Sequence, residues 1–219
     1  MRVAIAGAGN VGRSIARELI ANGHHVMLID KDPKAMKLES VAEAEWVMAD
    51  ACEIASLDNA KLDQCQVLVA ATGDDKVNLV ASLLAKTEYG VPRVVARINH
   101  PKNEWLFDKS WGVDVAVSTP RIIAALVEEA VSVGDVVRLF SLKAGEANLV
   151  ELTLPDNSSC IGKSVAEIDL PHDASLAAII RDGHVITPAA HDVFSAGDEL
   201  IFVASAHAED QLKSCFVAN

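Results

Sequence analysis

An apolar stretch near the start of the chain, Val3–Ala6, runs directly into the glycine pattern Gly7-x-Gly9-x-x-Gly12. A helical pattern follows the third glycine, and a second apolar run then ends on Asp30, 18 residues after Gly12. Strand, glycines, helix, strand and terminal acid in this order are typical of a dinucleotide-binding unit. The glycines alone would be weak evidence, because they also serve tight turns between a strand and a helix. The complete order therefore predicts the first half of a parallel, doubly wound sheet.

Each residue type at the start of this unit has a physical role in nucleotide binding. Gly7 permits the tight turn, Gly9 lets the backbone approach a pyrophosphate, and Gly12 lets the helix pack closely on the strand. The helix begins near Asn10 and Val11, and its first N–H groups are free to bind phosphates. These five residues are the first candidates for a nucleotide-binding site.

The ends of the next two strands add candidates, because ligands of doubly wound sheets lie at the carboxyl ends of the strands. Asp30 can accept hydrogen bonds from ribose hydroxyls and would repel a 2′-phosphate, although the charge of Lys31 could soften that repulsion. Asp50 could face an adenine amino group while the N–H of Ala51 faces a ring nitrogen. A helix cap is the alternative role for the Asp50 side chain.

Two later strand ends complete the candidate site. Thr72 and Gly73 follow an apolar strand, and small residues there allow the backbone to pass beneath a cofactor. Asp74 and Asp75 come next and are interpreted as caps of the following helix. Arg97 ends the next strand and could bind a phosphate, with a surface salt bridge as the alternative.

Strand and helix patterns alternate early in the chain, which predicts a nucleotide-binding α/β domain over residues 1–134. Six β units with helical crossovers predict a doubly wound, Rossmann-like parallel sheet covered on both faces. The expected strands are Val3–Ala6, His25–Ile29, Glu45–Ala49, Val67–Ala70, Arg93–Arg97 and Val113–Val117. The expected helical segments are Val11–Ala21, Pro33–Ala42, a turn at Glu53–Leu57, Lys76–Tyr89, Asn103–Trp111 and Pro120–Val131.

Short strands then replace the alternating pattern, which predicts a second, smaller α+β domain over residues 135–219. The charge balance changes there too, from 14 basic and 18 acidic side chains in residues 1–134 to 5 and 13 in residues 135–219. Asp182 and Gly183 predict a hairpin turn. The expected strands are Val137–Lys143, Asn148–Leu154, Leu176–Arg181, His184–Thr187 and Glu199–Val203, with helices at Gly162–Ile168 and Ala208–Phe216.

Composition disfavours several classes of function. The net charge of −12 disfavours a nucleic-acid partner, because sequence-independent binding requires a basic face. No apolar run approaches the length of a transmembrane helix, and the strand at the first residues leaves no room for a signal peptide. The four scattered cysteines predict reduced thiols in a cytoplasmic protein, with no disulfide framework and no zinc site.

Catalytic signatures are missing from the sequence. It contains no HExxH or GxSxG motif and no evident nucleophile–base pairing. A dehydrogenase also needs a substrate domain with an acid or base, and residues 135–219 are small and poor in convergent polar groups. We therefore expect a nucleotide sensor and not an enzyme. The alternatives are a small NAD-dependent oxidoreductase and a nucleotide-sensing module of another transporter.

Further segments resemble a known family over the whole chain. The first domain resembles the potassium-conductance regulator domain, called RCK or KTN, in Gly7–Gly12, Asp30, Ala49–Ala51, Val69–Asp74, Val77–Leu79 and Val95–Arg97. The second resembles its companion C-terminal domain in Leu154–Pro155, Ile161–Ile168, Val185–Pro188, Asp192 and Gly197–Ile201. The resemblance implies a Trk/Ktr-type potassium uptake regulator of the TrkA family.

The resemblance also implies ligands and partners. It implies a cytosolic protein that binds NAD(H), ATP or ADP and docks on a separate membrane potassium channel subunit. It implies homo-oligomers, in which dimers build a tetrameric or octameric ring. The apolar residues of Ile122–Val131 and the cluster in Trp105–Trp111 would help to form such an assembly.

Two ligands of some relatives are less well matched by this sequence. Those relatives bind a cation through an acidic residue after the last strand of the first domain, whereas Arg121 lies in the comparable segment, so no metal site is predicted. Others bind cyclic di-AMP between their C-terminal domains. Asp169, His172 and Asp173 stand where a basic residue would be expected to meet its phosphates.

Overall fold

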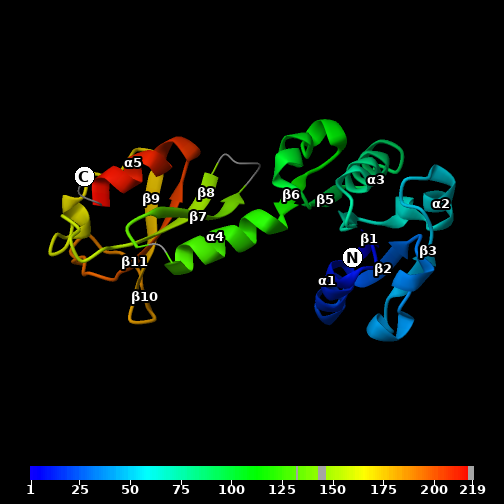
Figure 1. Ribbon diagram of the computed structural model, residues 1–219, viewed down its shortest axis with the longest axis horizontal. Coiled ribbons are helices and arrows are strands. Elements are labelled where there is room, and N and C mark those ends of the chain that lie inside the picture. Colours follow the sequence, from blue (N-terminus) through cyan, green and yellow to red (C-terminus); the bar gives the residue numbers. More distant parts are fainter. Residues whose placement is uncertain (132, 143–146, 217–219) are drawn as a thin grey trace. The chain divides into compact units, whose positions relative to one another are not determined.

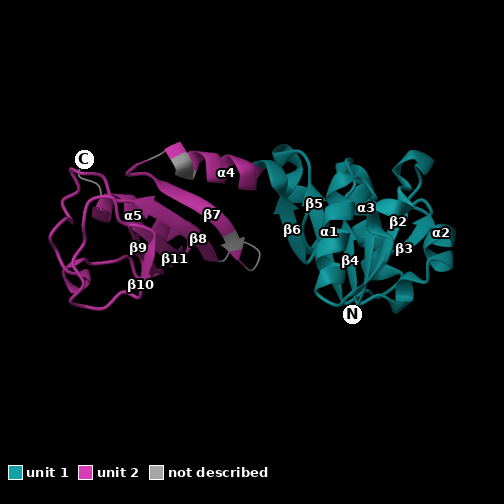
Figure 2. Cartoon of the chain, turned by 90° about the horizontal axis from the view of Figure 1, so that it is seen from below, with its two compact units in different colours: residues 1–120 teal, residues 121–219 magenta. Residues whose placement is uncertain are grey.

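The computed structural model describes residues 1–131, 133–142 and 147–216. The chain divides into two compact units, residues 1–120 and residues 121–219 (Figure 2). The domain boundary expected after residue 134 lies further along the chain than this division and stays a prediction.

The first unit, coloured from blue to green in Figure 1, contains a sheet with the strand order β3-β2-β1-β4-β5-β6, in which every neighbouring pair is parallel. The order reverses beside β1, where the chain passes from the β1-β2-β3 half to the β4-β5-β6 half. This topology confirms the predicted doubly wound, Rossmann-like sheet. The strands are β1 (Arg2–Ala6), β2 (His25–Asp30), β3 (Glu45–Met48), β4 (Val67–Ala70), β5 (Arg93–Ile98) and β6 (Val115–Ser118).

Helices cover both faces of this sheet. Successive side chains of a strand point to opposite faces, so each strand contributes apolar residues to a core on either side. Ala4 of β1 lies in one apolar core with Leu57 of α2 and Ala81 of α3. Its neighbour Ile5 lies in the opposite core with Ala16 of α1. The helices are α1 (Asn10–Ala21), α2 (Ile54–Asn59) and α3 (Asp75–Thr87), and a short 3-10 turn, η3 (Leu62–Gln64), follows α2.

Two connections in the first unit differ from the predicted helices. The 3-10 turns η1 (Pro33–Ala35) and η2 (Leu38–Val41) replace the helix expected over Pro33–Ala42. Between them Met36 and Lys37 have ψ values of 67° and 69°, outside the helical range. The hydroxyl of Ser40 donates to the Lys37 carbonyl, so a local side-chain bond stabilises the second turn in place of a longer helix.

The second difference also results from a local side-chain hydrogen bond. The 3-10 turns η4 (Pro101–Leu106) and η5 (Lys109–Trp111) replace the helix expected over Asn103–Trp111. The carboxylate of Asp108 accepts hydrogen bonds from the N–H and hydroxyl of Ser110, which starts a new turn where the first one ends. Aspartate favours such caps over helix interiors, so the apolar spacing alone gave the wrong element.

The second unit contains a sheet with the order β10-β9-β11-β8-β7, in which all neighbouring pairs of the described strands are antiparallel. Phe202 of this sheet packs against Phe216 of α5, which covers one face. Asp182 and Gly183 both have positive φ and connect β9 to β10, which confirms the predicted hairpin. The elements are α4 (Thr119–Val131), β7 (Val136–Leu142), β8 (Ala147–Thr153), β9 (Ala174–Arg181), β10 (His184–Ile186), β11 (Glu199–Ala204) and α5 (Ala206–Phe216).

Two expectations for the second unit need comment. The helix expected over Gly162–Ile168 is only the 3-10 turn η7 (Val165–Glu167), begun by a capping box between Ser164 and Glu167. Lys143, the expected last residue of the first strand, lies outside the described residues. Over the described part of the chain, every helix is too short or too polar to span a bilayer.

Candidate nucleotide site

The loop between β1 and α1 is tightly packed at its first and third glycines. Gly7 has a φ of +107°, and a Cβ atom there would lie 2.9 Å from the backbone nitrogen of Thr72. A Cβ atom on Gly12 would lie only 1.9 Å from the Gly7 carbonyl oxygen. Glycine is therefore required at both positions, at Gly7 by the β4–α3 loop and at Gly12 by the close approach of α1 to the strand end.

Gly9 has a different environment. Apart from Gly9 and its neighbours in the chain, no described atom lies within 4 Å of a Cβ atom built there, and the backbone φ of −68° suits any residue. Gly9 is also the N-cap of α1, and no side chain in the described structure caps it. The first N–H groups of α1, at the positive end of the helix dipole, therefore remain available to an anion. This is the arrangement in which helix N-termini bind phosphate.

Arg13 supports this loop from the inside. Its guanidinium donates hydrogen bonds to the Ala8 carbonyl and, over 2.6 Å, to Asn10 Oδ1. The residue is only 8% exposed, so hydrogen bonds to the loop, and not water, stabilise its charge. The sequence analysis did not select Arg13. Its position directly after Gly12 was the available signal, but the spacing gives no sign that the side chain is buried.

The carboxylate of Asp30 fixes the loop from the end of β2. Its Oδ2 accepts a hydrogen bond of 2.8 Å from the Ala8 N–H, and its Oδ1 accepts one of 2.9 Å from the Asp32 N–H. Each carboxylate oxygen can accept a second hydrogen bond, so this geometry leaves capacity for ribose hydroxyls. The structure thus places Asp30 beside the glycine loop.

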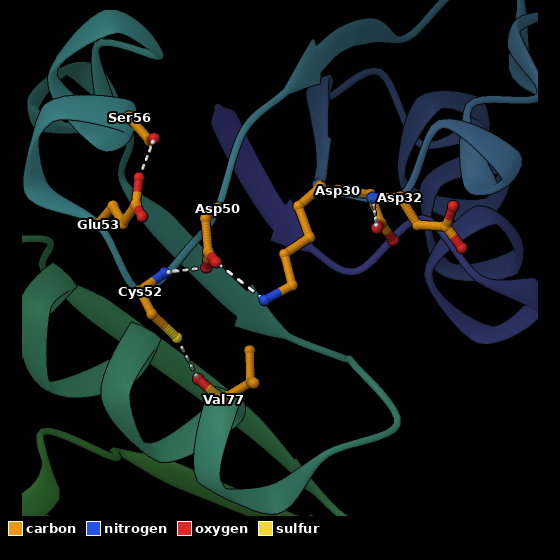
Figure 3. A network of polar contacts seen from close by, with 8 residues as sticks. Asp30, Asp32, Asp50, Cys52, Glu53, Ser56 and Val77 are labelled. Carbon is orange, nitrogen blue, oxygen red and sulfur yellow. Dashed lines mark hydrogen bonds and ion pairs between the residues drawn. The ribbon is translucent and has the colours of Figure 1, made fainter.

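Lys31 and Asp50 connect the ends of β2 and β3 (Figure 3). The Lys31 Nζ atom lies 2.9 Å from Asp50 Oδ2, and Asp50 Oδ1 accepts a hydrogen bond of 2.9 Å from the Cys52 N–H. The Cys52 N–H and then the Lys31 ammonium lower the pKa of Asp50, and the hydrogen bond to Asp50 raises the pKa of Lys31. Asp50 does not cap α2, because that helix begins at Ile54 with Glu53 at its N-cap.

The loop that contains Thr72 and Gly73 is held by Asn78 of α3. Asn78 is fully buried, and its Oδ1 accepts hydrogen bonds from the Thr72 N–H at 2.9 Å and from the Thr72 hydroxyl at 2.6 Å. Its Nδ2 donates to the Arg97 carbonyl at 2.9 Å. One asparagine therefore joins the ends of β4 and β5. Its place between Val77 and Leu79 in an apolar helix pattern was the signal that could have identified it.

Asp74 and Asp75 have different roles. Asp74 is the N-cap of α3 and accepts a hydrogen bond of 2.8 Å from the N–H two residues later, as expected. Asp75 is buried and accepts hydrogen bonds from the N–H groups of Asn99, at 2.7 Å, and His100, at 3.0 Å. Burial opposes its charge, but these and further hydrogen bonds keep the pKa of Asp75 below its usual range. The expectation that Asp75 caps the helix is wrong, because it binds the loop after β5.

Arg97 lies at the end of β5 with a half-buried side chain. Its Nε is buried and has no hydrogen-bond partner within the described residues. A buried guanidinium nitrogen without a partner is unfavourable, and an anionic ligand would satisfy it.

Ala51, the remaining candidate, is buried after the end of β3 beside Asp50.

The structure therefore gathers the predicted residues at the carboxyl ends of β1 to β5. Their roles toward a ligand stay predictions. The open space at Gly9, the uncapped N-terminus of α1 and the unpartnered Nε of Arg97 all fit a phosphate-containing nucleotide.

The residues that the structure describes give no support to the two other ligand sites considered from the sequence, for cyclic di-AMP and for a metal ion. His172 and Asp173 are exposed, with 3.2 Å between His172 Nδ1 and the Asp173 carboxylate, and Asp169 is exposed nearby in the sequence. Acidic groups repel phosphates, so we do not propose cyclic di-AMP as a ligand here. Among the described residues no cluster of three His, Cys, Asp or Glu side chains could hold a metal ion.

The fold and the glycine loop define a protein with a Rossmann-type α/β domain, followed along the chain by a small antiparallel β domain. The sequence matches the TrkA-N domain over residues 3–119 and the TrkA-C domain over residues 149–216. The chain belongs to the TrkA family. This membership confirms the expectation of a potassium-transport protein and not an enzyme.

Two relatives match almost their full length. The Trk system potassium uptake protein TrkA of Mycobacterium tuberculosis is 56% identical, over 97% of this chain and 96% of its own. A TrkA homolog from Methanothermobacter thermautotrophicus is 30% identical, over 91% of this chain and 92% of its own.

Solved structures share the fold. The GsuK channel bound to NAD superposes with a TM-score of 0.67 and 16% identity, over 98% of this chain and 39% of that chain. The Kef CTD of Shewanella denitrificans in its AMP-bound form has a TM-score of 0.52 and 25% identity, over 59% of this chain and 79% of that chain. The first likeness, at such low identity, shows the fold alone.

Proposed function

We propose that this chain is a nucleotide-sensing regulatory subunit of a potassium uptake system and gates a separate membrane subunit from the cytoplasmic side. The observation that carries the proposal is the open space beside Gly9, in front of the uncapped N-terminus of α1. We call this space, with the loop from Gly7 to Gly12 around it, the phosphate cradle. Tight packing at Gly7 and Gly12 and the bonds from Arg13 and Asp30 hold this cradle in a fixed shape. A preformed anion site costs little to order on binding.

The ligand we propose is NAD(H), ATP or ADP. The pyrophosphate would lie against Gly9 and the N-terminus of α1, and the ribose hydroxyls would donate to Asp30. Asp50 and the N–H of Ala51 would face the adenine, and Arg97 would bind a phosphate oxygen. The AMP-bound form of the Kef CTD supports this ligand class.

The proposed assembly is a homo-oligomer that docks on the membrane subunit. Ile123, Leu126 and Val127 of α4 are each more than half exposed, an unusual apolar surface for a monomer. The cluster in Trp105–Trp111 supports assembly less, because Phe107 is buried in the core of the first unit and only Trp105 is largely exposed. The acidic net charge disfavours direct binding to an anionic bilayer, so a protein partner would hold the chain at the membrane.

Nucleotide binding would control ion flux by favouring one arrangement of the paired domains. A ligand can shift such an equilibrium only by its differential affinity for the two arrangements. The coupling is reciprocal, so docking on the membrane subunit would change nucleotide affinity by the same factor that nucleotide changes docking.

The test is rubidium uptake in cells that lack this chain and other potassium systems. We expect the wild-type chain to restore uptake and growth at low potassium. The Gly9→Ala variant should not restore them, because its methyl group would fill the phosphate cradle. Ala21→Ser, which adds one heavy atom at the far end of α1, is the matched control and should restore both. Unchanged uptake after deletion would overturn the regulatory role.

A further inference from the structure

Lys31 is a basic side chain placed next to the acid that would bind ribose. Its position beside Asp30 creates a question of selectivity, because a free ammonium there would attract the 2′-phosphate of a phosphorylated nucleotide. In the structure the ammonium is bound, with Nζ 2.9 Å from Asp50 Oδ2 (Figure 3). The carboxylates of Asp30 and Asp32 flank Lys31 in the sequence, and Figure 3 shows both residues apart from Asp50.

We propose that Asp50 is a selectivity-determining residue, which withholds Lys31 from the 2′-phosphate and so makes the site reject NADP(H) in favour of NAD(H). The inference rests on the proposed nucleotide function and extends it to a group that does not itself contact the 2′ position.

The geometry explains why Asp50 takes the ammonium. The Asp30 carboxylate is directed at backbone N–H groups, those of Ala8 in the glycine loop and of Asp32. Asp50 is fixed by the Cys52 N–H through Oδ1, and its Oδ2 is directed at the end of β2, where it meets the Lys31 ammonium. The Lys31 side chain is 65% exposed and the Asp50 side chain 23%, so a half-buried carboxylate holds an exposed ammonium.

The charge balance explains the selectivity. While the Lys31–Asp50 pair is closed, the two charges cancel and the carboxylates of Asp30 and Asp32 dominate the field at the end of β2. A 2′-phosphate would meet like charge and no free cation, whereas a 2′-hydroxyl would meet a hydrogen-bond acceptor. If Asp50 were neutral, Lys31 would be free to pair with the phosphate, and the net negative charge would fall by one.

The test compares NADH and NADPH affinities by calorimetry, since these probes differ only in the 2′-phosphate. Asp50→Asn keeps the shape and the acceptor for the Cys52 N–H, and it removes the charge. Any loss of adenine contact affects both probes equally, so the ratio of their dissociation constants isolates the effect on Lys31. We expect the preference for NADH to fall about tenfold, the scale of one gained charge-assisted contact. Asp50→Ser, whose hydroxyl can also accept from Cys52, should have the same effect.

A double mutant assigns the effect to Lys31. In Asp50→Asn/Lys31→Met the preference for NADH should return to the wild-type value, because no ammonium remains to be released. Lys34→Met in the Asp50→Asn background is the matched control, since Lys34 is also exposed, and it should leave the relaxed preference unchanged.

The outcomes separate this inference from the proposed function. Wild-type chain that binds neither NADH nor ADP would overturn the nucleotide function itself. Wild-type chain that binds NADH, with a folded Asp50→Asn variant whose NADH preference is unchanged, would overturn only the role of Asp50. Equal binding of NADH and NADPH by the wild type would also overturn it.

Discussion

Both units bury carboxylates that accept several hydrogen bonds, but the two units use them differently. In the first unit the carboxylate of Asp75 and the amide of Asn78 bind loop backbone at the strand ends, and the loop that Asn78 holds packs against Gly7. In the second unit Asp198 is fully buried and accepts two hydrogen bonds of 2.7 Å from Arg181, together with the N–H of Ser195. That network ties the sheet to its own turn. The comparison indicates that the same chemistry shapes the edge of the candidate nucleotide site in one unit and closes a sheet in the other.

The largest effect is expected for Gly12→Ala, because Gly12 lies where α1 packs closely on the strand end at the candidate nucleotide site. The added Cβ would overlap the Gly7 carbonyl oxygen at 1.9 Å, and this atom belongs to the backbone, which cannot move aside as a flexible side chain could. We expect a loss of roughly 4 kcal/mol or more, enough to leave the first unit unfolded. Circular dichroism and limited proteolysis measure this. A variant that melts like the wild type would show that the loop tolerates movement.

A smaller effect is expected for Asp198→Asn in the second unit. The exchange leaves Arg181 without its charged partner, and because Arg181 is partly exposed we expect a loss of about 2–3 kcal/mol in urea denaturation. NADH binding to the first unit should be unchanged at temperatures where the variant is folded. Asp182→Asn is the control: it lies in the positive-φ turn that asparagine tolerates well, and it should be neutral. Lost NADH binding in folded Asp198→Asn would break the comparison.

Asp75→Asn tests the loop-holding network of the first unit. Replacing a carboxylate that accepts several hydrogen bonds should cost about 1–3 kcal/mol at neutral pH. The pKa of Asp75 is lower in the folded state than in the unfolded chain, so its stabilisation is present above about pH 4 and is lost as the pH falls through the folded value. Denaturation at several pH values should therefore show a steeper acid loss in the wild type than in the variant. Parallel curves would contradict this assignment.

The smallest effect concerns Tyr89. Its hydroxyl contacts α2, and these hydrogen bonds involve no loop of the candidate nucleotide site. Its hydroxyl lies 2.8 Å from Asp58 Oδ1, and burial and this contact raise the pKa of Tyr89 to about 12. Since the folded pKa is raised, the associated stability is complete below about pH 10 and is lost as the pH rises toward the folded value. The chain has one tyrosine, so tyrosinate absorbance reports it directly. Titration near the ordinary value would refute the contact, and Asp58→Asn should lower the pKa.

Sequence predicted the parts of this fold that depend on local spacing. The glycine loop, the alternating strands and helices of the first unit and the Asp182–Gly183 hairpin follow from residues near one another in the chain. The apolar pattern around Asn78 could have marked it as buried, but the partners of Asn78 and Asp75 could not be predicted, because Arg97 and Asn99 lie 19 and 24 residues away. Local side-chain bonds decided the remaining differences, where Ser40 and Asp108 replace helices by turns.

The candidate site divides in the same way. Spacing placed Gly7, Gly9, Gly12 and Asp30 together, because strand ends of a parallel sheet share one edge. It could not reveal that Arg13 is buried under the loop or that Lys31 is bound to Asp50. Both facts depend on side-chain geometry across the sheet.

The most direct test of the account is calorimetric titration of the Gly9→Ala variant with NADH and ADP. Beyond its chain neighbours Gly9 has open space around an added methyl group, so the variant should fold, and its melting temperature should fall by only a few degrees because alanine is a weaker N-cap than glycine. Its nucleotide affinity should fall at least about tenfold, because the methyl group blocks the approach of phosphate to the helix N-terminus. The control Ala21→Ser should bind like the wild type. Unchanged affinity in a folded Gly9→Ala variant would contradict the central claim that this loop is the phosphate-binding site.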